Sequence, residues 1–175
     1  MKWYRDISDA EMEHRLRFIE ATKPWIGTPF RDQSDILGAG VDCAMLMYRS
    51  GMDTGVWPEG ARDPRPYPPR WHLRKGSDEM YLKWADEYAT CVAEGEGYTA
   101  LEYRVPGNML VIKEGWTFSH GVLLLPDNQI IHAWYELGEV AIEHQHQVKI
   151  AFFPRTGKPR PFKIYDPWVR PGVTK

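Results

Sequence analysis

One cysteine and two histidines have the residue types and the order of a thiol-based catalytic site. Cys43 begins a short apolar run behind a glycine-rich stretch, and His120 and His132 lie in two later β-rich runs. A thiol acts as a nucleophile when a nearby base takes its proton and a third polar group orients that base. A helix N-terminus also favours the thiolate, so we expect the pKa of Cys43 to fall well below the usual value of about 8.5.

Three helices are expected to position this chemistry in the first half of the chain. They span residues 8–23, 43–48 and 77–89. Ser8 and Glu11 form a capping box at the start of the first helix, and Asp42 is the expected N-cap of the second. We expect the second helix to end near Gly51. Cys43 is its first residue and therefore lies at a helix N-terminus. The following residues, 52–76, contain five prolines and predict a long surface loop.

The second half of the chain is rich in β-forming residues. The predicted strands span residues 109–112, 121–125, 129–134, 140–142 and 150–153. The segment Pro126-Asp127-Asn128 is typical of a hairpin connection, which would put His120 and His132 on neighbouring strands. Helices followed by a meander of strands predict an α+β fold, with N-terminal helices packed on a C-terminal antiparallel sheet.

Four short motifs resemble the NlpC-type cell-wall peptidases, over residues 14–153. They are Gly27-Thr28-Pro29-Phe30-Arg31, Gly40-Val41-Asp42-Cys43, Ser119-His120-Gly121-Val122 and Ile131-His132-Ala133, in the order of that family. The resemblance implies a papain-like fold and a site without metal or cofactor, with Cys43 as nucleophile, His120 as base and His132 as the third polar member. It also implies cleavage of peptidoglycan stem peptides, next to γ-D-glutamyl and diaminopimelate residues.

Residues 67–73 are similar to a stretch in the phage-encoded branch of this family, the tail-associated peptidases of siphophages and gene transfer agents. This resemblance implies phage tail-tip proteins as partners. The N-terminal residues have a charged helical pattern and no apolar signal segment, and no run reaches the roughly 18 apolar residues of a membrane span. We therefore expect synthesis in the cytoplasm, assembly into a virion tail, and action at the host cell wall.

Several positions depart from the family pattern. Phe30 stands where the family usually has tyrosine, Met45 where glycine is usual, and Asn108 where aspartate is usual. We expect substrate contacts from Phe30, Arg31, Gln33 and Asp42, with Gln33 or Arg31 replacing the missing phenol and Asp42 acting mainly as a helix cap. Phe30 and Met45 also favour one alternative, a structural tail subunit with a vestigial peptidase site.

Other interpretations remain open at the level of sequence. A contact-dependent amidase toxin would share this fold, and a lipid acyltransferase would use the same cysteine and histidine but would need an apolar cleft or a membrane anchor. Cys43, His120 and His132 are also a legitimate zinc set. His144 and His146 alternate on a predicted strand and are expected to form a solvated face, and Cys91 is expected to be a plain thiol.

Composition restricts the class of protein. The 175 residues are 43% hydrophobic with a formal net charge of −2, which predicts a packed core and gives no general attraction to nucleic acid. Two cysteines do not make a disulfide framework. We expect a peptidase domain over residues 1–154.

Residues 155–175 are expected to form a separate basic tail. They contain six lysines or arginines, one acidic residue and four prolines. Because prolines fix an extended path and remove backbone donors, this tail is not expected to enter a sheet interior. It is expected to lie in a groove of its own domain or to dock on an acidic partner, so that its removal would leave small-peptide hydrolysis within a few-fold of normal.

Overall fold

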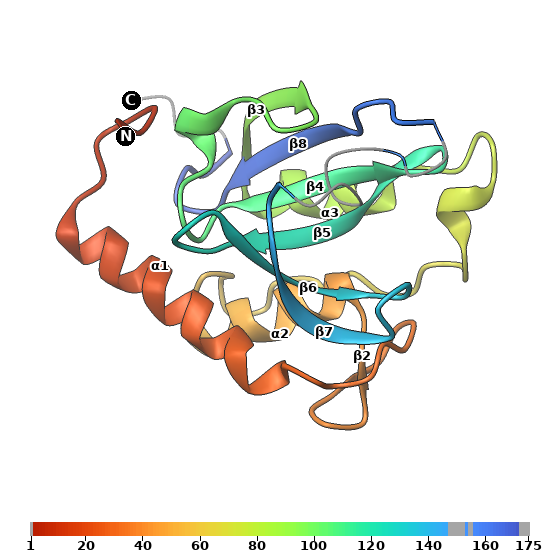
Figure 1. Ribbon diagram of the computed structural model, residues 1–175. Helices are drawn as coiled ribbons and strands as arrows, with labels where there is room; N and C mark the ends of the chain where they lie inside the picture. The colour runs from red at the N-terminus through yellow and green to blue at the C-terminus, as the bar shows by residue number, and fades with distance from the viewer. Residues whose placement is uncertain (1, 147–152, 154–155, 172–175) are drawn as a thin grey trace.

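The structure is a computed structural model that describes residues 2–146, 153 and 156–171. Its helices come first and an antiparallel sheet follows (Figure 1), so the predicted α+β class is confirmed. The α-helices are α1 (Asp9–Thr22), α2 (Cys43–Thr54) and α3 (Met80–Tyr88). The short 3-10 helices are η1 (Lys23–Trp25), η2 (Trp71–Leu73) and η3 (Leu101–Tyr103). No helix among the described residues has the length and apolar character needed to cross a membrane.

Six strands form the main sheet, in the order β3-β8-β4-β5-β6-β7 with every neighbouring pair antiparallel. They are β3 (Thr90–Glu96), β4 (Met109–Glu114), β5 (Thr117–Leu124), β6 (Gln129–Trp134), β7 (Glu139–His144) and β8 (Pro161–Asp166). A separate two-stranded ribbon, β1 (Asp35–Ile36) and β2 (Gly40–Val41), precedes α2. The predicted strand at 150–153 lies outside the described residues except for Phe153.

Both predicted helix caps are present. The Ser8 hydroxyl accepts a hydrogen bond from the Glu11 N–H at 3.2 Å, and the Asp42 carboxylate accepts one from the Met45 N–H at 2.9 Å. The expected end of α2 near Gly51 is wrong, because the helix continues to Thr54. Gly51 instead lies inside the helix, where the Trp57 ring packs so closely that a Cβ would come within 2.0 Å of its Nε1.

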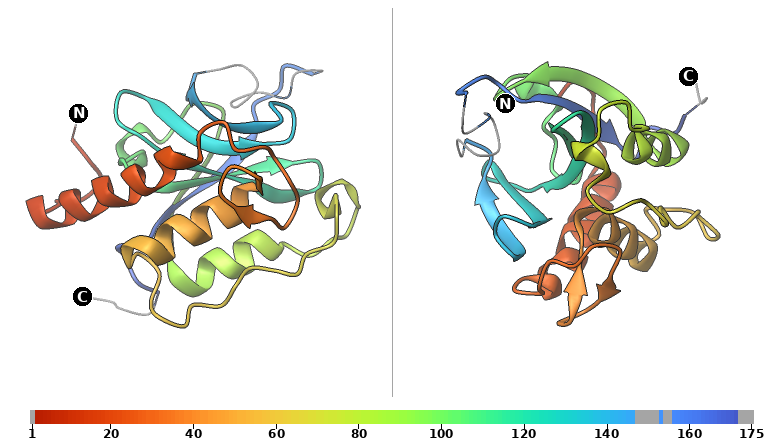
Figure 2. Two further views of the ribbon diagram at one scale, coloured as in Figure 1. Left: turned by 90° about the horizontal axis from the view of Figure 1, so that it is seen from below. Right: turned by 90° about the vertical axis from the view of Figure 1, so that its right-hand side faces the viewer.

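The sheet has a separate apolar cluster on each face. Met109, Val111, Leu123 and Ile131 pack with the helices in the larger cluster, while Leu110, Ile112, Val122, Leu124 and Ile130 belong to the second. The helices gather on one side of the sheet (Figure 2), and α2 and α3 both contact β5. This alternation along β4, β5 and β6 gives the strands one fixed register, because a one-residue slip would exchange the two faces.

The hairpin between β5 and β6 brings the two predicted catalytic histidines together. Asp127 and Asn128 both have positive φ angles, 58° and 57°, as the two central residues of a type I′ turn require. The two strands pair only at Leu123–Ile131 and Leu124–Ile130, and then separate. Extending that register would set Val122 opposite His132, so His120 and His132 are diagonal neighbours on the two adjacent strands that the sequence predicted for them.

The expectation that residues 155–175 stay out of the sheet is wrong. Strand β8 lies between β3 and β4 and pairs with both. Its prolines do not break the ladder, because Pro161 is the first residue of the strand and Pro167 follows the last. Between them, Phe162, Ile164 and Tyr165 are all at most 2% exposed. The proline-rich segment is therefore part of the core.

The end of β8 is fixed by a buried ion pair. Both Asp166 carboxylate oxygens accept hydrogen bonds from the Arg15 guanidinium, at 2.7 and 2.8 Å, and both side chains are 0% exposed. Arg15 also donates to the Asn108 side chain at 2.7 Å, and its guanidinium stacks on the Trp168 ring. Asn108, at a position where the sequence departs from the family pattern, thus helps to join α1 to the sheet.

Candidate active site

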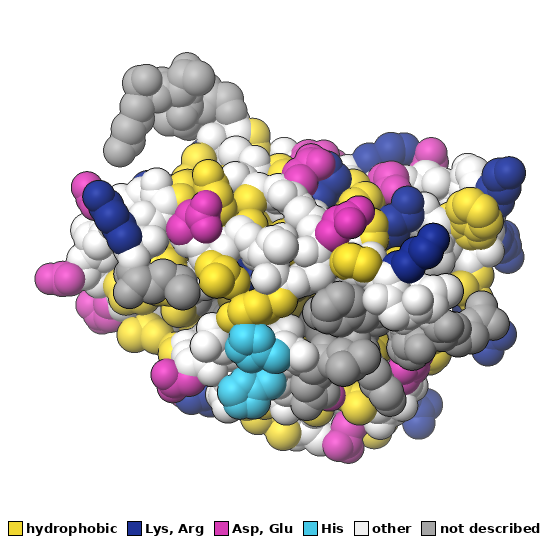
Figure 3. All heavy atoms as spheres, turned by 45° about the horizontal axis from the view of Figure 1, so that its top comes forward, with side chains coloured by type: hydrophobic (Ala, Val, Ile, Leu, Met, Phe, Trp, Pro, Cys, Tyr) yellow, Lys and Arg dark blue, Asp and Glu magenta, His cyan; other side chains and the backbone are white. Residues whose placement is uncertain are grey.

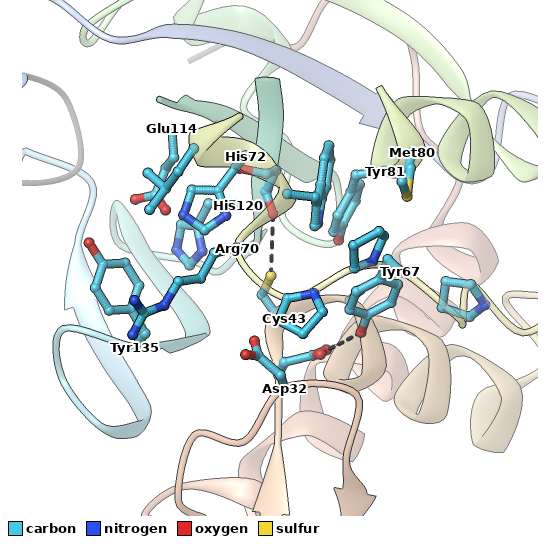
Figure 4. Close-up of a pocket in the computed structure, with 18 of the residues that line it drawn as sticks. Asp32, Cys43, Tyr67, Arg70, His72, Met80, Tyr81, Glu114, His120 and Tyr135 are labelled. Atoms are coloured by element: carbon cyan, nitrogen blue, oxygen red, sulfur yellow. Dashed lines mark hydrogen bonds between the residues drawn. The ribbon is translucent and has the colours of Figure 1, made fainter. Parts of the chain in front are cut away.

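A cavity of about 460 Å³ opens where α2 begins and where β5 and β6 separate. Both Cys43 and His120 line it (Figure 4), and so do Asp42, Phe30 and Trp134. All seven residues of the 67–73 segment line it as well. The structure therefore brings the predicted nucleophile and the predicted base into one cavity.

Cys43 is the first residue of α2, and its sulfur lies beside the backbone of β5. The thiol donates a hydrogen bond to the Ser119 carbonyl, with Sγ and O 3.6 Å apart. Burial raises the pKa of the Cys43 thiol, and the negative charge of Asp42 raises it further, while the N–H groups of Gly121 and Ala44 act in the opposite direction. Burial of this half-buried thiol thus acts against the low pKa expected from the sequence, because the loss of solvent opposes the effect of the helix terminus.

Behind His120, a chain of hydrogen bonds runs across three strands. His120 Nε2 and His132 Nδ1 are 2.8 Å apart, and His132 Nε2 lies 2.9 Å from a carboxylate oxygen of Glu143 on β7. The Glu143 carboxylate can only accept, so a neutral His132 donates to it from Nε2 and accepts at Nδ1. His120 must then donate from Nε2, which leaves its Nδ1 unprotonated and free to act as a base.

His120 is held in its neutral form. It is 4% exposed and stacks on the Trp134 ring with centroids 5.4 Å apart. Burial lowers the pKa of His120 well below its ordinary value, and the neighbouring His132 and Arg160 add to this effect. A neutral thiol and a neutral imidazole therefore face the same cavity, the resting state of a general-base mechanism.

The alkylation of Cys43 by iodoacetamide should follow this neutral pairing. Because only the thiolate reacts and burial raises its pKa, the rate should climb about tenfold per pH unit from pH 6 to 9 without a plateau. Mass spectrometry of a Cys91→Ala variant measures this rate at Cys43 alone, with glutathione as the reference thiol. A plateau near pH 6 would instead reveal a thiolate–imidazolium pair.

The four predicted substrate residues have different positions. Phe30 and Asp42 line the cavity, but Arg31 and Gln33 do not. The Arg31 side chain packs against Gly40, and the backbone N–H of Gln33 donates to Asp42 at 2.6 Å. The geometry thus gives no support to a replacement of the missing phenol by Arg31 or Gln33.

Asp42 has its carboxylate oxygens occupied by the protein. One oxygen caps α2 through Met45, and the other accepts from Gln33 N–H and from the Tyr67 hydroxyl. Burial raises the pKa of Asp42, and these three donors lower it. Asp42 therefore fastens the 67–73 segment to the start of α2, which extends its predicted role as a cap.

The 67–73 segment is also fastened at its far end. The His72 carbonyl accepts a hydrogen bond from Trp116 N–H at 2.8 Å, in the turn between β4 and β5. Gly115 permits this contact, because a Cβ there would come within 2.5 Å of the same carbonyl oxygen. Burial lowers the pKa of His72, which lines the cavity beside Arg70. This segment is therefore a fixed wall of the cavity.

Three residues at or behind this cavity were not predicted from the sequence. Glu143 orients His132, Tyr81 of α3 lines the cavity, and Glu114 lines it near Trp134 and Arg160. Burial raises the pKa of Glu114 to about 7. Glu143 could have been suggested by the alternation along β7, because it lies on the same face of the strand as Ala141, which pairs with His132. Tyr81 and Glu114 gave no signal in a single sequence.

The zinc interpretation finds no support in the site geometry. His120 Nε2 and His132 Nδ1 face each other and share a hydrogen bond. The described residues contain no group of three metal-ligating side chains around one point. His144 and His146 are exposed at the surface, where their rings lie 6.5 Å apart. Figure 3 shows histidine side chains side by side on a face where acidic and basic groups are interspersed.

Comparison with models of known protein families and with curated protein sequences finds no match for this chain.

Proposed function

We propose that this protein is a papain-like cysteine hydrolase that cleaves amide bonds in peptidoglycan stem peptides. The observation that supports this most is the hydrogen-bonded series His120–His132–Glu143, which ends in the cavity that contains Cys43. A nucleophile, a base and groups that orient the base are the minimum set for covalent acyl transfer.

In the proposed mechanism, the thiol proton of Cys43 passes to Nδ1 of His120 as the sulfur attacks the amide carbonyl carbon. The tetrahedral adduct collapses when His120 returns that proton to the leaving amine, and a thioester on Cys43 remains. Water then attacks the thioester with His120 again as base, which releases the carboxylic acid and restores the thiol. The positive charge that forms on His120 is stabilised through His132 and the Glu143 carboxylate.

The substrate class rests on the four motifs that resemble those of NlpC-type peptidases. Delivery on a phage tail rests on residues 67–73, the segment that resembles the phage-encoded branch and that forms a wall of the cavity. Under this proposal the protein joins tail-tip proteins in the virion and acts at the host cell wall. The cavity wall would then contact the peptide next to the cleaved bond.

Purified peptidoglycan and synthetic stem peptides containing γ-D-glutamyl-diaminopimelate test this function. The wild-type protein should release fragments with a new amino terminus, detected by mass spectrometry, and iodoacetamide treatment should stop their release. Cys91→Ala is the matched control, because Cys91 lies on β3 outside the cavity, and it should keep full activity. If fresh protein cleaves neither sacculi nor any stem peptide, the vestigial-site interpretation gains instead.

A second candidate, acyl transfer from a lipid, is favoured by one observation. Met80 and Trp84 of α3 line the cavity together with Tyr67 of the 67–73 segment, and they give it an apolar part. Such a lining suits a fatty acyl chain as well as an apolar peptide face. A fatty acyl thioester offered to the wild-type protein decides between the two, since a lipid enzyme would form an acyl adduct on Cys43 and a stem-peptide hydrolase would not.

A further inference from the structure

The Tyr81 hydroxyl is a buried polar group without a partner. Tyr81 is 5% exposed, and its Oη makes no hydrogen bond within the described part of the chain. A buried hydroxyl left in this state costs about 1–3 kcal/mol of stability. A native fold keeps such a group for a reason, and a catalytic role, strain or a bound water or ion are the usual ones.

This hydroxyl lies close to the nucleophile. Tyr81 lines the same cavity as Cys43, and its Oη packs on Gly121, where a Cβ would come within 1.9 Å of it. The N–H of that same Gly121 acts on the Cys43 sulfur. Figure 4 shows His120 to the left of the Cys43 sulfur and Tyr81 to its right, both above it in that view. A carbonyl carbon on the sulfur would thus lie near both a base and a phenol.

Among the tyrosines that line this cavity, Tyr81 is the one whose hydroxyl makes no hydrogen bond to any described residue. The Tyr67 hydroxyl donates to Asp42, and the Tyr135 hydroxyl donates to Glu136 at 3.2 Å. Phe30 has no hydroxyl. Burial raises the pKa of Tyr81 well above its ordinary value, so the group keeps its proton across the working pH range.

We propose that Tyr81 Oη donates a hydrogen bond to the oxyanion that forms when Cys43 attacks the substrate carbonyl. The inference rests on the proposed hydrolase function and assigns the donor that Phe30 cannot supply. The donor is preorganised, because Gly121 and the Trp84 ring, 6.1 Å away edge-on, hold the Tyr81 ring in place. A fixed donor in a site shielded from water stabilises the transition state more than the ground state. The same proposal accounts for glycine at position 121, since any side chain there would displace the phenol.

Tyr81→Phe tests the assignment, because it removes the hydroxyl and keeps the ring. We expect kcat for stem-peptide hydrolysis to fall about 10²–10³-fold with little change in KM, the loss typical of one oxyanion donor. The thermal midpoint should stay equal or rise, since an unpartnered buried hydroxyl is removed.

Tyr88→Phe is the matched control on the same helix. The Tyr88 hydroxyl accepts a hydrogen bond from Arg62 N–H at 2.6 Å, and Tyr88 does not line the cavity. This variant should keep wild-type kcat and lose a little stability. Tyr81→Phe is thus expected to lower kcat without a loss of stability, whereas Tyr88→Phe is expected to lower stability without a loss of kcat.

A stem-peptide aldehyde gives a readout that does not require turnover. It forms a reversible hemithioacetal with Cys43 whose oxygen takes the oxyanion position, and Tyr81→Phe should weaken its binding at least about tenfold while iodoacetamide alkylation stays unchanged. Full kcat or unchanged aldehyde affinity in Tyr81→Phe overturns the assignment, as does a parallel loss of stability and activity. A wild-type protein that binds the aldehyde through Tyr81 but hydrolyses no stem peptide contradicts the proposed function and not the role of Tyr81.

Discussion

Replacing Cys43 by alanine should abolish stem-peptide hydrolysis and leave the fold intact. The thiol donates a hydrogen bond to the Ser119 carbonyl, and alanine preserves the start of α2, which Asp42 caps independently. Loss of the nucleophile removes the covalent route, so kcat should fall on the order of 10⁴-fold or more. Turnover with defined stem peptides measures the loss, and an unchanged thermal midpoint shows that the fold is retained.

His120→Ala should cost nearly as much, because the members of one catalytic unit depend on each other. Adding it to Cys43→Ala should produce almost no further loss. His132→Ala and Glu143→Gln should be milder, since these residues set the tautomer of His120 and do not receive the thiol proton. The exposed histidine of β7 provides the matched control, and His144→Ala should have wild-type activity. A dead His132→Ala beside an active His120→Ala would reverse the assigned roles.

The pH dependence of hydrolysis by the wild-type protein follows from the protonation of His120, the proposed base for Cys43. Hydrolysis requires neutral His120, and burial lowers its pKa below the usual value of about 6.5, so kcat/KM should decline only well below that pH. The lowered pKa of His120 also makes the free energy of unfolding depend on pH. Between the lowered folded pKa and about 6.5 the unfolded chain binds more protons, so this histidine makes folding less favourable as pH falls through that window.

Local signals in the sequence predicted the parts of the site that local chemistry determines. The capping residues Ser8 and Asp42 start their helices, and the turn at Asp127 and Asn128 brings His120 and His132 onto neighbouring strands. These features depend on a few adjacent residues. The confirmed α+β arrangement follows from them, because a helix-rich half before a strand-rich half leaves few ways to pack.

Features that depend on distant parts of the chain could not be predicted in the same way. Strand β3 has the polar sequence of an edge strand, and β8 is flanked by prolines, so neither resembles a buried strand. The pKa of Cys43 depends on burial by elements far away in the chain. The approach of Tyr81 to Gly121 joins α3 to β5 over a long sequence separation. Such contacts are determined by tertiary packing, which cannot be derived from a single sequence.

A chain that ends at residue 154 should fail to fold. The deletion removes β8, so β3 loses the neighbour through which it pairs with the sheet and β4 loses its partner on that side. It also removes Phe162, Ile164 and Tyr165, and burying three such side chains contributes roughly 4.5–9 kcal/mol. This loss alone is comparable with the whole stability of a typical domain, about 5–15 kcal/mol.

The deletion also removes one ion-pair partner of a buried charge, because Arg15 pairs with Asp166 as well as with Glu11. Arg15 is 0% exposed and loses both hydrogen bonds to Asp166, and breaking one side of a buried pair typically costs about 3–5 kcal/mol. Asp166→Ala isolates this part of the loss in the full-length chain, and urea unfolding should show a decrease of that size. Glu13→Ala is its control, because Glu13 pairs with Arg17 at the surface, where a salt bridge contributes about 1 kcal/mol at most.

Deletion of residues 172–175 alone separates loss of β8 from mere shortening of the chain. That variant keeps β8, and it also keeps Arg170, whose guanidinium donates to the Val56 carbonyl at 3.0 Å and to the Tyr88 carbonyl at 3.1 Å. It should unfold cooperatively near the wild-type midpoint, while the chain ending at 154 should show no cooperative transition in circular dichroism and should precipitate or be digested rapidly by protease. A stable, active chain ending at 154 would mean that β8 is dispensable and that the segment serves docking. The two truncations therefore decide whether residues 155–171 belong to the folding unit that holds Cys43 and His120 in one cavity.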